Sequence, residues 1–556
     1  MTDTARSSAD ATTGVDLTYQ AALDAGRFEI QRCGACARHV FYPRESCPHC
    51  GSADLAWVAP TGRGTAHATT TVRRKADAGG DYNVTLVDLD EGVRLMSRVD
   101  GLNGVAADAV RIGQRVQARV AVAQGHGTLL FDAVADNAAV AVAATAAVSP
   151  PTPAKAPSAP MAPSLRSTPD PLRGRAAIAG VATFGCGEAP GFSDMALLAR
   201  AAQSAIADAG LTLADIDGVC TASAGATMWA MPVIEQLGLR PTYVDGTMLG
   251  GSSFIAHLLP AMRALEAGQC NAVLVCYGSA QRTAQFGRKE IAQARRWMDP
   301  QPYETPYEPF NPPSAYALAA SRHMHQYGTT RRQLAEVAVA ARAWAQRNPE
   351  AFARDPLSID DVLAARMVSD PLSVRDCCLV TDGGGAYVLV RADRARDLPK
   401  KPVYVLGNAT AVWNRQISSM HDLTVTAASE SGRLAYRMAG LGPKDIGVLE
   451  LYDAFTINTL LFLEDLGFCP KGEAGRFVEG GTIAPGGRLP VNTNGGGLSC
   501  VHPGMYGIFA LIEAVRQLRG EGGERQVAGV QTALAHGNGG TLSSQATAIL
   551  GTAEAL

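Results

Sequence analysis

An internal repeat limits what most of this chain can fold into. The letters "AGL" at 209–211 and "DI" at 215–216 return as "AGL" at 439–441 and "DI" at 445–446, in a chain of 556 residues. Each copy follows an amphipathic helical pattern and precedes a strand, a glycine-rich turn and another helix ("MLGGSSFIAHLL" and "NGGGLSCVHPGMYGIFALI"). Two similar halves predict a pseudo-symmetric double domain. The alternation of strands and helices predicts a mostly parallel sheet with helices on both faces.

A change in composition separates this repeat from the N-terminal part of the chain. Residues 137–173 are rich in Ala and Pro ("AVAATAAVSPPTPAKAPSAPMAPSLRSTPDP"), which predicts a semi-rigid linker between domains. We expect the small polar residues 1–20 to form a disordered leader. The other expected domains are a metal ribbon at 21–56, a barrel at 57–136, and an α/β domain at 174–556 with halves of about 174–397 and 398–556.

Four cysteines near the N-terminus have the spacing of a metal site. Cys33 and Cys36 form one CxxC pair, and Cys47 and Cys50 form a second pair. Two such pairs place four thiolates around one ion, as in structural zinc sites, and leave no open position for catalysis. We therefore predict structural Zn²⁺, with iron as an alternative ion. Disulfides or free thiols are the other interpretation. Because no apolar leader opens the chain, we expect a cytoplasmic protein with reduced cysteines.

Short alternating runs follow the ribbon and predict a small antiparallel barrel ("GRGTAHATTTV", "NVTLVDLD", "VRLMSRV", "RVQARVAVA" and "TLLFDAV"). The net charge is −3 and no basic stripe with aromatics is present, so we expect no nucleic-acid partner. The longest Ala-rich run is too short for a membrane span. Ribbon and barrel together, over about 20–136, resemble the DUF35 family, a rubredoxin-like ribbon plus an OB-fold. Its members accompany thiolase-like proteins of acyl-CoA metabolism.

A glycine-rich stretch in the second half lies between two titratable side chains. The glycines at 495–497 precede His502, and Tyr452 lies upstream of them. Glycine permits positive φ and close approach to a ligand. A following helix would direct its free N–H groups at the same place. We therefore predict a proton-transfer site here. An ordinary turn beside core aromatics is the alternative.

Several phrases of residues 174–556 resemble the thiolase superfamily, in its SCP-x or lipid-transfer-protein-like branch. They are "DAGLTLADIDGV", "GGSSF", "SRHMHQYGTTRRQLAEVAV", "DCCLVTDGGGAYVLV", "ELYDAFTINTLLFLEDLGF" and "NTNGGGLSCVHP". The resemblance implies a five-layered αβαβα fold of two like halves, an acyl-CoA substrate and at least a homodimer. Where thiolases carry their nucleophilic cysteine this chain has Met248, and near their second cysteine it has Ala535 and His536. A thioether cannot form an acyl-enzyme.

Loss of the nucleophile makes the chain similar to the thiolase-like aldolases of steroid side-chain degradation, which work with a DUF35 partner. In that family a "YDxF" tyrosine acts as base, so the resemblance gives this role to Tyr452. We expect retro-aldol cleavage of a β-hydroxyacyl-CoA. His502 would donate to the enolate oxygen or return a proton to Cα, and His536 is a weaker candidate. The residues expected to line the substrate site are Gly495, Gly496, Gly497, Tyr506 and Met248.

Two other functions remain open at this point. A thiolase or acyltransferase could use Cys500 as a displaced nucleophile, and a non-enzymatic protein could bind acyl-CoA or lipid on the same scaffold. The remaining cysteines considered fit small buried side chains: Cys186, Cys220, Cys276, Cys377, Cys378 and Cys469. An insertion at about 281–352 is rich in Arg, Pro and aromatics. We expect it either to cover a site or subunit interface or to be a plain surface excursion.

Overall fold

The computed structural model describes residues 13–100, 108–134, 170–284 and 302–556. They belong to two compact units, described separately below. The first unit lies within 1–167 and 292–322, and the second within 168–291 and 323–556. Most of the predicted linker lies outside the described residues.

The first unit opens with a helix and a small sheet. Helix α1 (Val15–Asp24) buries Tyr19 and Leu23 in the core of this unit. The predicted disordered leader is therefore wrong for residues 15–20, because apolar packing orders them; residues 1–12 lie outside the described part. In the small sheet, β1 (Ile30–Cys33) pairs antiparallel with β2 (His39–Val40) and with β3 (Leu55–Val58).

A five-stranded barrel completes the first unit and confirms the predicted antiparallel barrel. Its strands are β4 (Arg63–Val72), β5 (Tyr82–Leu89), β6 (Arg94–Ser97), β7 (Arg115–Ala123) and β8 (His126–Ala133). The central strand β4 pairs with both β5 and β7, and these pair in turn with β6 and β8. A parallel bridge between Val99 and Phe131 joins the two ends, which is the closure of an OB-fold.

Residues 302–322 also belong to the first unit, far along the chain from its other members. The Tyr303 ring stacks on Tyr42 with centroids 5.1 Å apart, and it makes edge contacts with Tyr19 and Phe41 at 5.8 and 5.7 Å. The Arg98 guanidinium donates to the Tyr307 carbonyl oxygen at 3.0 and 3.1 Å. The boundaries expected from the sequence placed this segment in the α/β domain.

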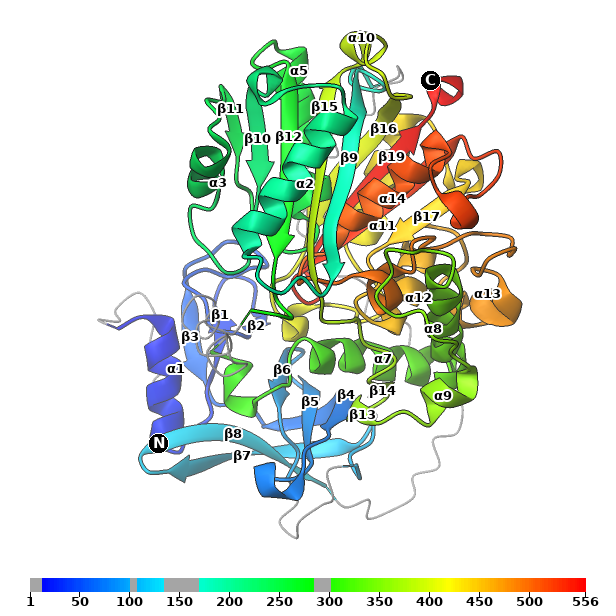
Figure 1. The fold of residues 1–556 in the computed structure, drawn as a ribbon. Coiled ribbons are helices and arrows are strands. Elements are labelled where there is room, and N and C mark those ends of the chain that lie inside the picture. The colour runs from blue at the N-terminus through cyan, green and yellow to red at the C-terminus, as the bar shows by residue number, and fades with distance from the viewer. Residues whose placement is uncertain (1–12, 101–107, 135–169, 285–301) are drawn as a thin grey trace. The chain divides into compact units, whose positions relative to one another are not determined.

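The second unit is built on a nine-stranded sheet of order β11-β10-β12-β15-β9-β16-β19-β18-β17 (Figure 1). The strands of its first half are β9 (Ala176–Gly187), β10 (Gly218–Thr221), β11 (Tyr243–Asp245), β12 (Ala272–Ser279) and β15 (Asp382–Arg391). Those of its second half are β16 (Val403–Val412), β17 (Val448–Leu451), β18 (Thr532–Gly539) and β19 (Ser544–Gly551). A short antiparallel hairpin is formed by β13 (Met367–Ser369) and β14 (Leu372–Ser373).

The sheet is mixed, so the prediction of a mostly parallel sheet is wrong. The parallel pairs are β10 with β11, β10 with β12, and β17 with β18. The other neighbours are antiparallel. A short turn joins β18 directly to β19, and such hairpins force the antiparallel direction. The alternation of strands and helices in the sequence indicates parallel pairs only where a helix links neighbouring strands.

The two predicted halves are confirmed by their mirrored strand orders and by matching turns. Helices α2 (Asp194–Asp208) and α11 (Ala428–Ala439) are followed by glycines at left-handed φ, with values of 70° at Gly210 and 66° at Gly440. Asp215 then accepts the Thr212 N–H at 2.9 Å, and in the other half Asp445 accepts the N–H of residue 442 at 2.8 Å. The repeated letters therefore encode one helix-ending turn used twice.

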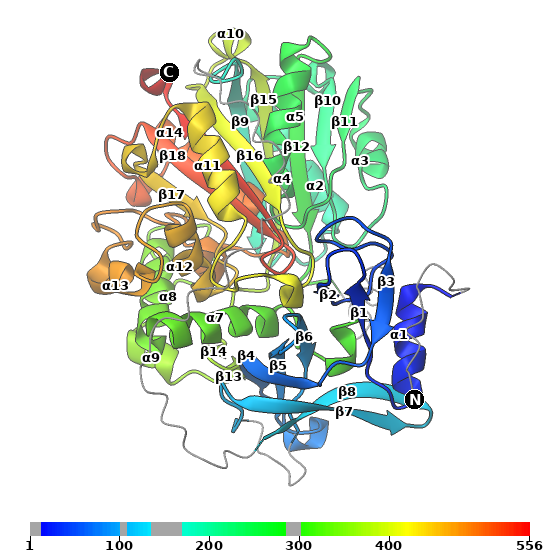
Figure 2. The same cartoon turned by 180° about the vertical axis from the view of Figure 1, so that it is seen from behind.

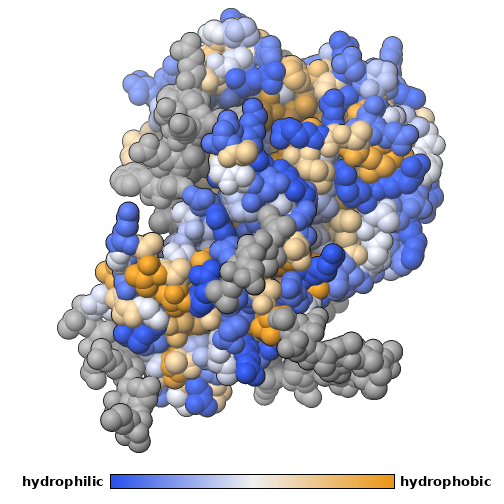
Figure 3. All heavy atoms as spheres, turned by 90° about the horizontal axis from the view of Figure 1, so that it is seen from below, coloured by the Kyte–Doolittle hydropathy of each residue, from blue (hydrophilic) through white to orange (hydrophobic). Residues whose placement is uncertain are grey.

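Helices cover both faces of this sheet. In Figure 1, α2 and α14 (Gly507–Arg519) lie in front of the sheet. Figure 2 shows the opposite face, which α5 (Leu258–Glu266) and α11 cover. The other α-helices outside the first unit's N-terminal region are α3 (Ala230–Leu237), α4 (Ser253–Ala256), α7 (Pro313–Tyr327), α8 (Arg331–Ala345), α9 (Ile359–Leu363), α10 (Ala392–Ala395), α12 (Thr456–Asp465) and α13 (Ala474–Val478). On the face in Figure 3, hydrophobic side chains form patches between polar ones. Among the described residues, no helix has the length and apolarity needed to cross a membrane.

Candidate functional site

Tyr452 follows the last residue of β17, and its backbone N–H donates to the His536 carbonyl at 3.0 Å. Its hydroxyl oxygen accepts the Tyr506 backbone N–H at 3.2 Å and donates to the Gly504 carbonyl at 3.4 Å. Tyr506 is the N-cap of α14. A helix N-terminus and a donated N–H both favour negative charge on the acceptor. The phenol oxygen thus accepts an N–H from the N-terminus of α14 while its own proton is directed at a carbonyl.

Three aromatic rings meet at this point. The Tyr452 ring lies 5.5 Å from the His502 ring at 89° and 5.6 Å from the Tyr506 ring at 85°. The His502 and Tyr506 rings are nearly parallel, at 12°. The Tyr506 hydroxyl is buried and donates to Asn494 Oδ1 at 2.9 Å. The structure therefore brings Tyr452, His502 and Tyr506 together, as the sequence predicted.

One ring nitrogen of His502 forms no hydrogen bond within the described part of the chain. Its backbone N–H donates to Thr381 Oγ1 at 2.9 Å, which fixes the residue beside Tyr452. The Nε2 atom is buried and has no hydrogen-bond partner among the described residues. Burial lowers the pKa of His502 to about 4, so the imidazole is neutral at neutral pH. A neutral imidazole can still donate one hydrogen bond.

The first-half turn reaches this site through a glycine that the sequence analysis did not single out. A Cβ atom at Gly251 would clash with the ring and hydroxyl of Tyr452, so only glycine fits there. Met248 precedes it in the same turn, with 43 % of its surface exposed. Its Sδ accepts a hydrogen bond from Ser253 Oγ at 3.9 Å. In the sequence, the motif "GGSSF" is the feature that could have indicated Gly251.

Asp453 is a second residue that the sequence analysis missed, although it stands in "YDAF" beside Tyr452. It is fully buried, and its carboxylate accepts the Gly497 N–H at 2.6 Å and the Leu498 N–H at 3.4 Å. Burial raises its pKa to about 7, against the effect of these N–H donors. A Cβ at Gly496, where φ is 64°, would clash with the same carboxylate.

The glycines at 495–497 are all buried, and residues Gly496–Cys500 form a π-helical turn. Positive φ is observed at Gly495 and Gly496, as expected for such a turn. Without side chains, these glycines lie close to Asp453 and to Ala345 of α8. They therefore shape the turn that carries His502.

His536 has the features of a structural histidine. It is fully buried, with Nδ1 2.9 Å from Thr547 Oγ1 and Nε2 3.0 Å from Gln545 Oε1. Its ring also packs on Phe462, with centroids 4.5 Å apart. Burial lowers its pKa to about 4. Since both nitrogens are engaged, His536 has none left to offer a substrate.

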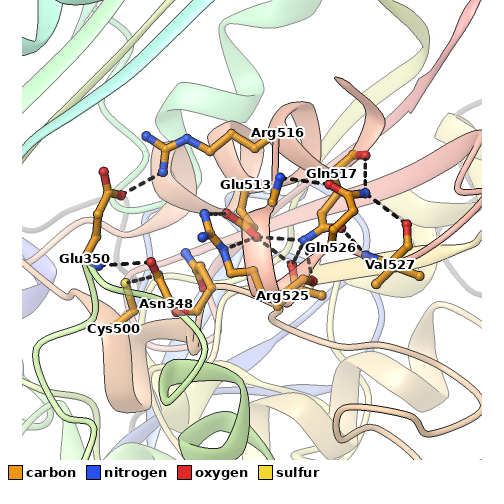
Figure 4. A network of polar contacts seen from close by, with 12 residues as sticks. Asn348, Glu350, Cys500, Glu513, Arg516, Gln517, Arg525, Gln526 and Val527 are labelled. Carbon is orange, nitrogen blue, oxygen red and sulfur yellow. Dashed lines mark hydrogen bonds and ion pairs between the residues drawn. The ribbon is translucent and has the colours of Figure 1, made fainter. Parts of the chain in front are cut away.

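Cys500 lies beside the polar network of Figure 4, and Asn348 Nδ2 donates to its sulfur at 3.5 Å. The thiol is buried, and burial raises its pKa well above the ordinary range. A neutral buried thiol is a poor nucleophile, because the thiolate is the reactive form. This environment does not activate Cys500.

The four ribbon cysteines converge as predicted. Their sulfurs all lie within 4.8 Å of one another, with Cys33 to Cys50 at 3.6 Å and Cys36 to Cys47 at 3.7 Å. The backbone N–H of Cys36 lowers the pKa of Cys33 to about 7, which favours a thiolate ligand. The set fits a tetrahedral metal site.

The two knuckles share one backbone pattern. Cys33 N–H donates to the Arg38 carbonyl at 2.9 Å, and Cys47 N–H donates to that of Ser52 at 2.8 Å. The fourth residue after each of these cysteines, Ala37 or Gly51, donates back to the cysteine carbonyl and has positive φ. Two copies of one loop thus present two sulfurs each, which supports the structural interpretation.

Comparisons with known proteins agree with this architecture. Residues 20–56 match the rubredoxin-like zinc ribbon domain of ChsH2, residues 57–121 match the ChsH2 C-terminal OB-fold domain, and residues 409–552 match the thiolase C-terminal domain-like family. A solved "Ltp2-ChsH2(DUF35) aldolase" is similar, with a TM-score of 0.62 and 33% identity, covering 68% of this chain and 98% of that one.

Two relatives of similar identity are named for different reactions. A steroid side-chain-cleaving aldolase of Thermomonospora curvata is 36% identical over 63% of this chain and 91% of its own length. An acetyl-CoA acetyltransferase of Methanothermobacter thermautotrophicus is 35% identical over 66% of this chain and 96% of its own length. The chain belongs to the thiolase superfamily, with an N-terminal ChsH2-type zinc ribbon and OB-fold. Because identity to the two relatives is almost equal, the site residues must decide between aldol and Claisen chemistry.

Proposed function

We propose that this protein is a carbon–carbon lyase that cleaves a β-hydroxyacyl-CoA by a retro-aldol reaction. The products are a carbonyl compound and a shorter acyl-CoA, and no acyl-enzyme forms. The observation that carries the proposal is the hydroxyl of Tyr452 at the N-terminus of α14, facing a turn that has Met248 in place of a thiol. The similarity to two proteins named as aldolases supports it.

The proposed reaction begins at Tyr452. Its phenolate takes the β-hydroxyl proton, the new oxyanion becomes a carbonyl, and the Cα–Cβ electron pair moves into the thioester as an enolate. The N–H of Tyr506 stabilises the phenolate before this transfer. The carbonyl product leaves, and the proton taken by Tyr452 is transferred to Cα of the enolate, which restores the phenolate. The net result is cleavage of one bond with no gain or loss of electrons.

His502 is proposed to stabilise the enolate. Its Nε2 is buried beside Tyr452 and lacks a partner among the described residues. A neutral imidazole N–H aimed at the thioester oxygen acts as an electrophile where charge develops. Because the pKa of His502 is held at about 4, the ring does not take the proton that Tyr452 must receive. The tyrosine and the histidine therefore have separate tasks.

The Claisen alternative needs a nucleophile that this site does not favour. Cys500 is buried and its thiol is held neutral. Met248 cannot lose a proton or carry an acyl group. A purely binding function is disfavoured because Nε2 of His502, which lies beside Tyr452, is buried without a hydrogen-bond partner among the described residues. Such a group is costly unless something uses it.

We also propose structural zinc in the ribbon, a cytoplasmic location and a homodimer. Thiolate ligands require reducing conditions, which supports the location. Three apolar side chains are exposed near this edge of the sheet: Val244 of the edge strand β11 at 46 %, Met231 of α3 at 61 %, and Met228 just before α3 at 72 %. An exposed apolar sheet edge is suited to pairing with a second copy. Light scattering of wild type and Val244→Arg tests this: a dimer that becomes a monomer supports it, and a wild-type monomer contradicts it.

The decisive assay supplies a β-hydroxyacyl-CoA bearing a steroid side chain, without free CoA. We expect equal amounts of carbonyl product and shorter acyl-CoA, at a rate that added CoA does not raise. A β-ketoacyl-CoA with free CoA should give no thiolysis. Cleavage that occurs only with the ketoacyl substrate and free thiol would contradict the proposal.

A further inference from the structure

A cavity of about 60 Å³ in the second unit holds two arginines and no acidic side chain. Its lining residues are Ala338, Arg342, Leu357, Val374, Arg375, Cys377, Cys378, Leu379, Leu498 and Ser499. A water needs about 10–15 Å³ of such space, so the cavity can take roughly four waters or one small oxyanion. It borders the π-helical turn but contains neither Tyr452 nor His502.

Arg342 of α8 is the buried charge in this cavity, with only 5 % of its surface exposed. Its Nε donates to Ser499 Oγ at 3.0 Å, and its Nη1 donates to the Asp355 carbonyl at 2.8 Å. Both acceptors are neutral. Among the described residues, no carboxylate forms an ion pair with it. Burial lowers the pKa of Arg342, and the nearby Arg375 lowers it further, while the charge of Asp355 acts in the opposite direction.

Three other arginines of the second unit, one buried and two partly buried, differ from Arg342 on this point. Arg525 pairs with Glu513 at 2.9 Å and Arg516 with Glu350 at 2.8 Å (Figure 4). Arg519 pairs with Asp208 at 2.9 Å. Buried charges in proteins are paired, because an isolated ion pays a large desolvation cost. Within the described ranges, Arg342 thus has no carboxylate at ion-pair distance, whereas each of these three arginines has one.

The thiols of the cavity do not supply that charge. Burial raises the pKa of Cys377 well above its ordinary value and raises that of Cys378 to about 12, so both are neutral. Cys377 Sγ donates to the Ser373 carbonyl at 3.2 Å. The Ser499 hydroxyl accepts from Arg342, while its own hydrogen has no acceptor in the part of the chain that the structure describes. The cavity thus offers donors and positive charge.

We propose that this cavity binds a small inorganic oxyanion of the phosphate or sulfate type. Arg342 and Arg375 supply the charge, and the Ser499 hydroxyl supplies a neutral donor; guanidinium groups match such oxygens well. Ser499 lies in the turn 496–500, whose N–H groups hold Asp453. The bound anion therefore fixes the turn that precedes His502. Binding itself requires no assumption about the reaction catalysed.

Calorimetric titration of the full-length protein with inorganic phosphate, at constant ionic strength, tests the proposal. We expect one phosphate per chain and a binding constant weakened about tenfold or more by Arg342→Gln and by Arg375→Gln, the range for a charge-assisted hydrogen bond. Arg332→Gln is the matched control, because Arg332 is an exposed residue of α8 outside the cavity lining. No binding, or equal binding by all variants, would overturn the proposal. Displacement of phosphate by CoA would also overturn it, because the ion would then belong to the substrate.

The melting temperature in phosphate-free buffer is a second measurement, which can be made on variants that no longer bind phosphate. Arg525→Gln should lower the melting temperature strongly, because it leaves Glu513 buried without its partner. Arg342→Gln should lower it far less, since no carboxylate of the described residues forms an ion pair with Arg342 and none is left buried without its partner. Phosphate should raise the melting temperature of wild type and of Arg332→Gln but not of Arg342→Gln. Equal losses for the two buried arginines, or an equal phosphate effect in all variants, would contradict the site.

Discussion

Two glycine-rich turns occupy corresponding places in the two halves of the second unit, and they contribute different things to the site. The first-half turn, residues 248–252, contributes an exposed methionine and the space that Gly251 leaves for Tyr452. The second-half turn, residues 495–506, contributes the His502 ring and the Tyr506 N–H. The second-half turn thus carries the polar groups, whereas the first-half turn contributes only shape. The following changes test that division.

The largest effect should come from Tyr452→Phe. Removal of the hydroxyl deletes the proposed base, so we expect kcat to fall about 10²–10⁴-fold while the fold is retained. Steady-state kinetics on the β-hydroxyacyl-CoA measure this. Tyr436→Phe is the control: it also removes a hydrogen-bonded hydroxyl, which donates to the Leu466 carbonyl at 3.1 Å. If both variants kept full activity, the base would lie elsewhere.

His502→Ala should lower kcat about 10²–10³-fold, the usual cost of one donor to a developing oxyanion. His502→Gln should recover part of this, since an amide keeps an N–H. His536→Gln should instead lower thermal stability and leave kcat of the folded protein near wild type, because both nitrogens of the His536 ring are engaged by Thr547 and Gln545. A larger kcat loss for His536→Gln than for His502→Ala would reverse these assignments.

Asp453→Asn should change how stability depends on pH. The folded-state pKa of Asp453 is about 7, above the ordinary value of 3.8, so the native state binds the proton more tightly than the unfolded state. The stabilisation from this proton is complete below about pH 4 and is lost as pH rises to about 7. Asparagine cannot titrate. The stability of the variant relative to wild type should therefore rise over this window, by a few kcal/mol.

Denaturant unfolding at pH 4.5, 6 and 8 measures that difference. His502 and His536 have lowered pKa values of about 4, so they act in the opposite direction: their contribution is present above about pH 6.5 and is lost as pH falls towards 4. Wild type and Asp453→Asn both contain these histidines, so the contribution of the histidines to the unfolding free energy cancels in the difference. A difference that does not change with pH would contradict the raised pKa of Asp453.

Gly251→Ala tests the part of the site that the first-half turn provides. The added methyl group meets the Tyr452 ring, and we expect a loss of about 1–3 kcal/mol in unfolding free energy, as for overpacking, together with reduced kcat. Gly225→Ala is the control in the same half, because a Cβ there meets open space. Equal behaviour of the two variants would show that the turn is not needed for the position of Tyr452.

The smallest effect should come from Cys500. Cys500→Ala and treatment with iodoacetamide should leave kcat of C–C cleavage nearly unchanged, because the buried neutral thiol takes no part and alkylation requires a thiolate. Measurement of kcat before and after each treatment is sufficient. Loss of activity in Cys500→Ala at unchanged melting temperature would favour the Claisen alternative.

Features that depend on local spacing could be predicted from the sequence. The two CxxC pairs gave the metal site, and the repeated "AGL…DI" gave the two halves, because each pattern encodes a short turn. Tyr452, His502 and Tyr506 were also predicted to share a site, through the thiolase resemblance. The role of Asp453 was missed, since its carboxylate acts on residues more than 40 positions away.

Features that depend on distant packing could not be predicted in this way. Tyr303 joins the aromatic cluster of the first unit although almost 290 residues separate it from Tyr19. The direction of β15 and β19 depends on how the chain returns to the sheet, which strand and helix patterns do not contain. That Met248 replaces a nucleophile remains a prediction from the resemblance, and the importance of Gly251 follows only from the contact that a Cβ there would make with Tyr452.

Mass spectrometry of the intact protein, quenched during turnover, tests the central claim most directly. The claim is that cleavage proceeds without an acyl-enzyme, because the first-half turn has Met248 and the second-half thiol, Cys500, is buried and neutral. We expect the mass of the protein to be unchanged at every time point while the carbonyl product accumulates. A mass increase equal to the acyl group, located on Cys500 and formed at the rate of turnover, would contradict the account and favour thiolase chemistry.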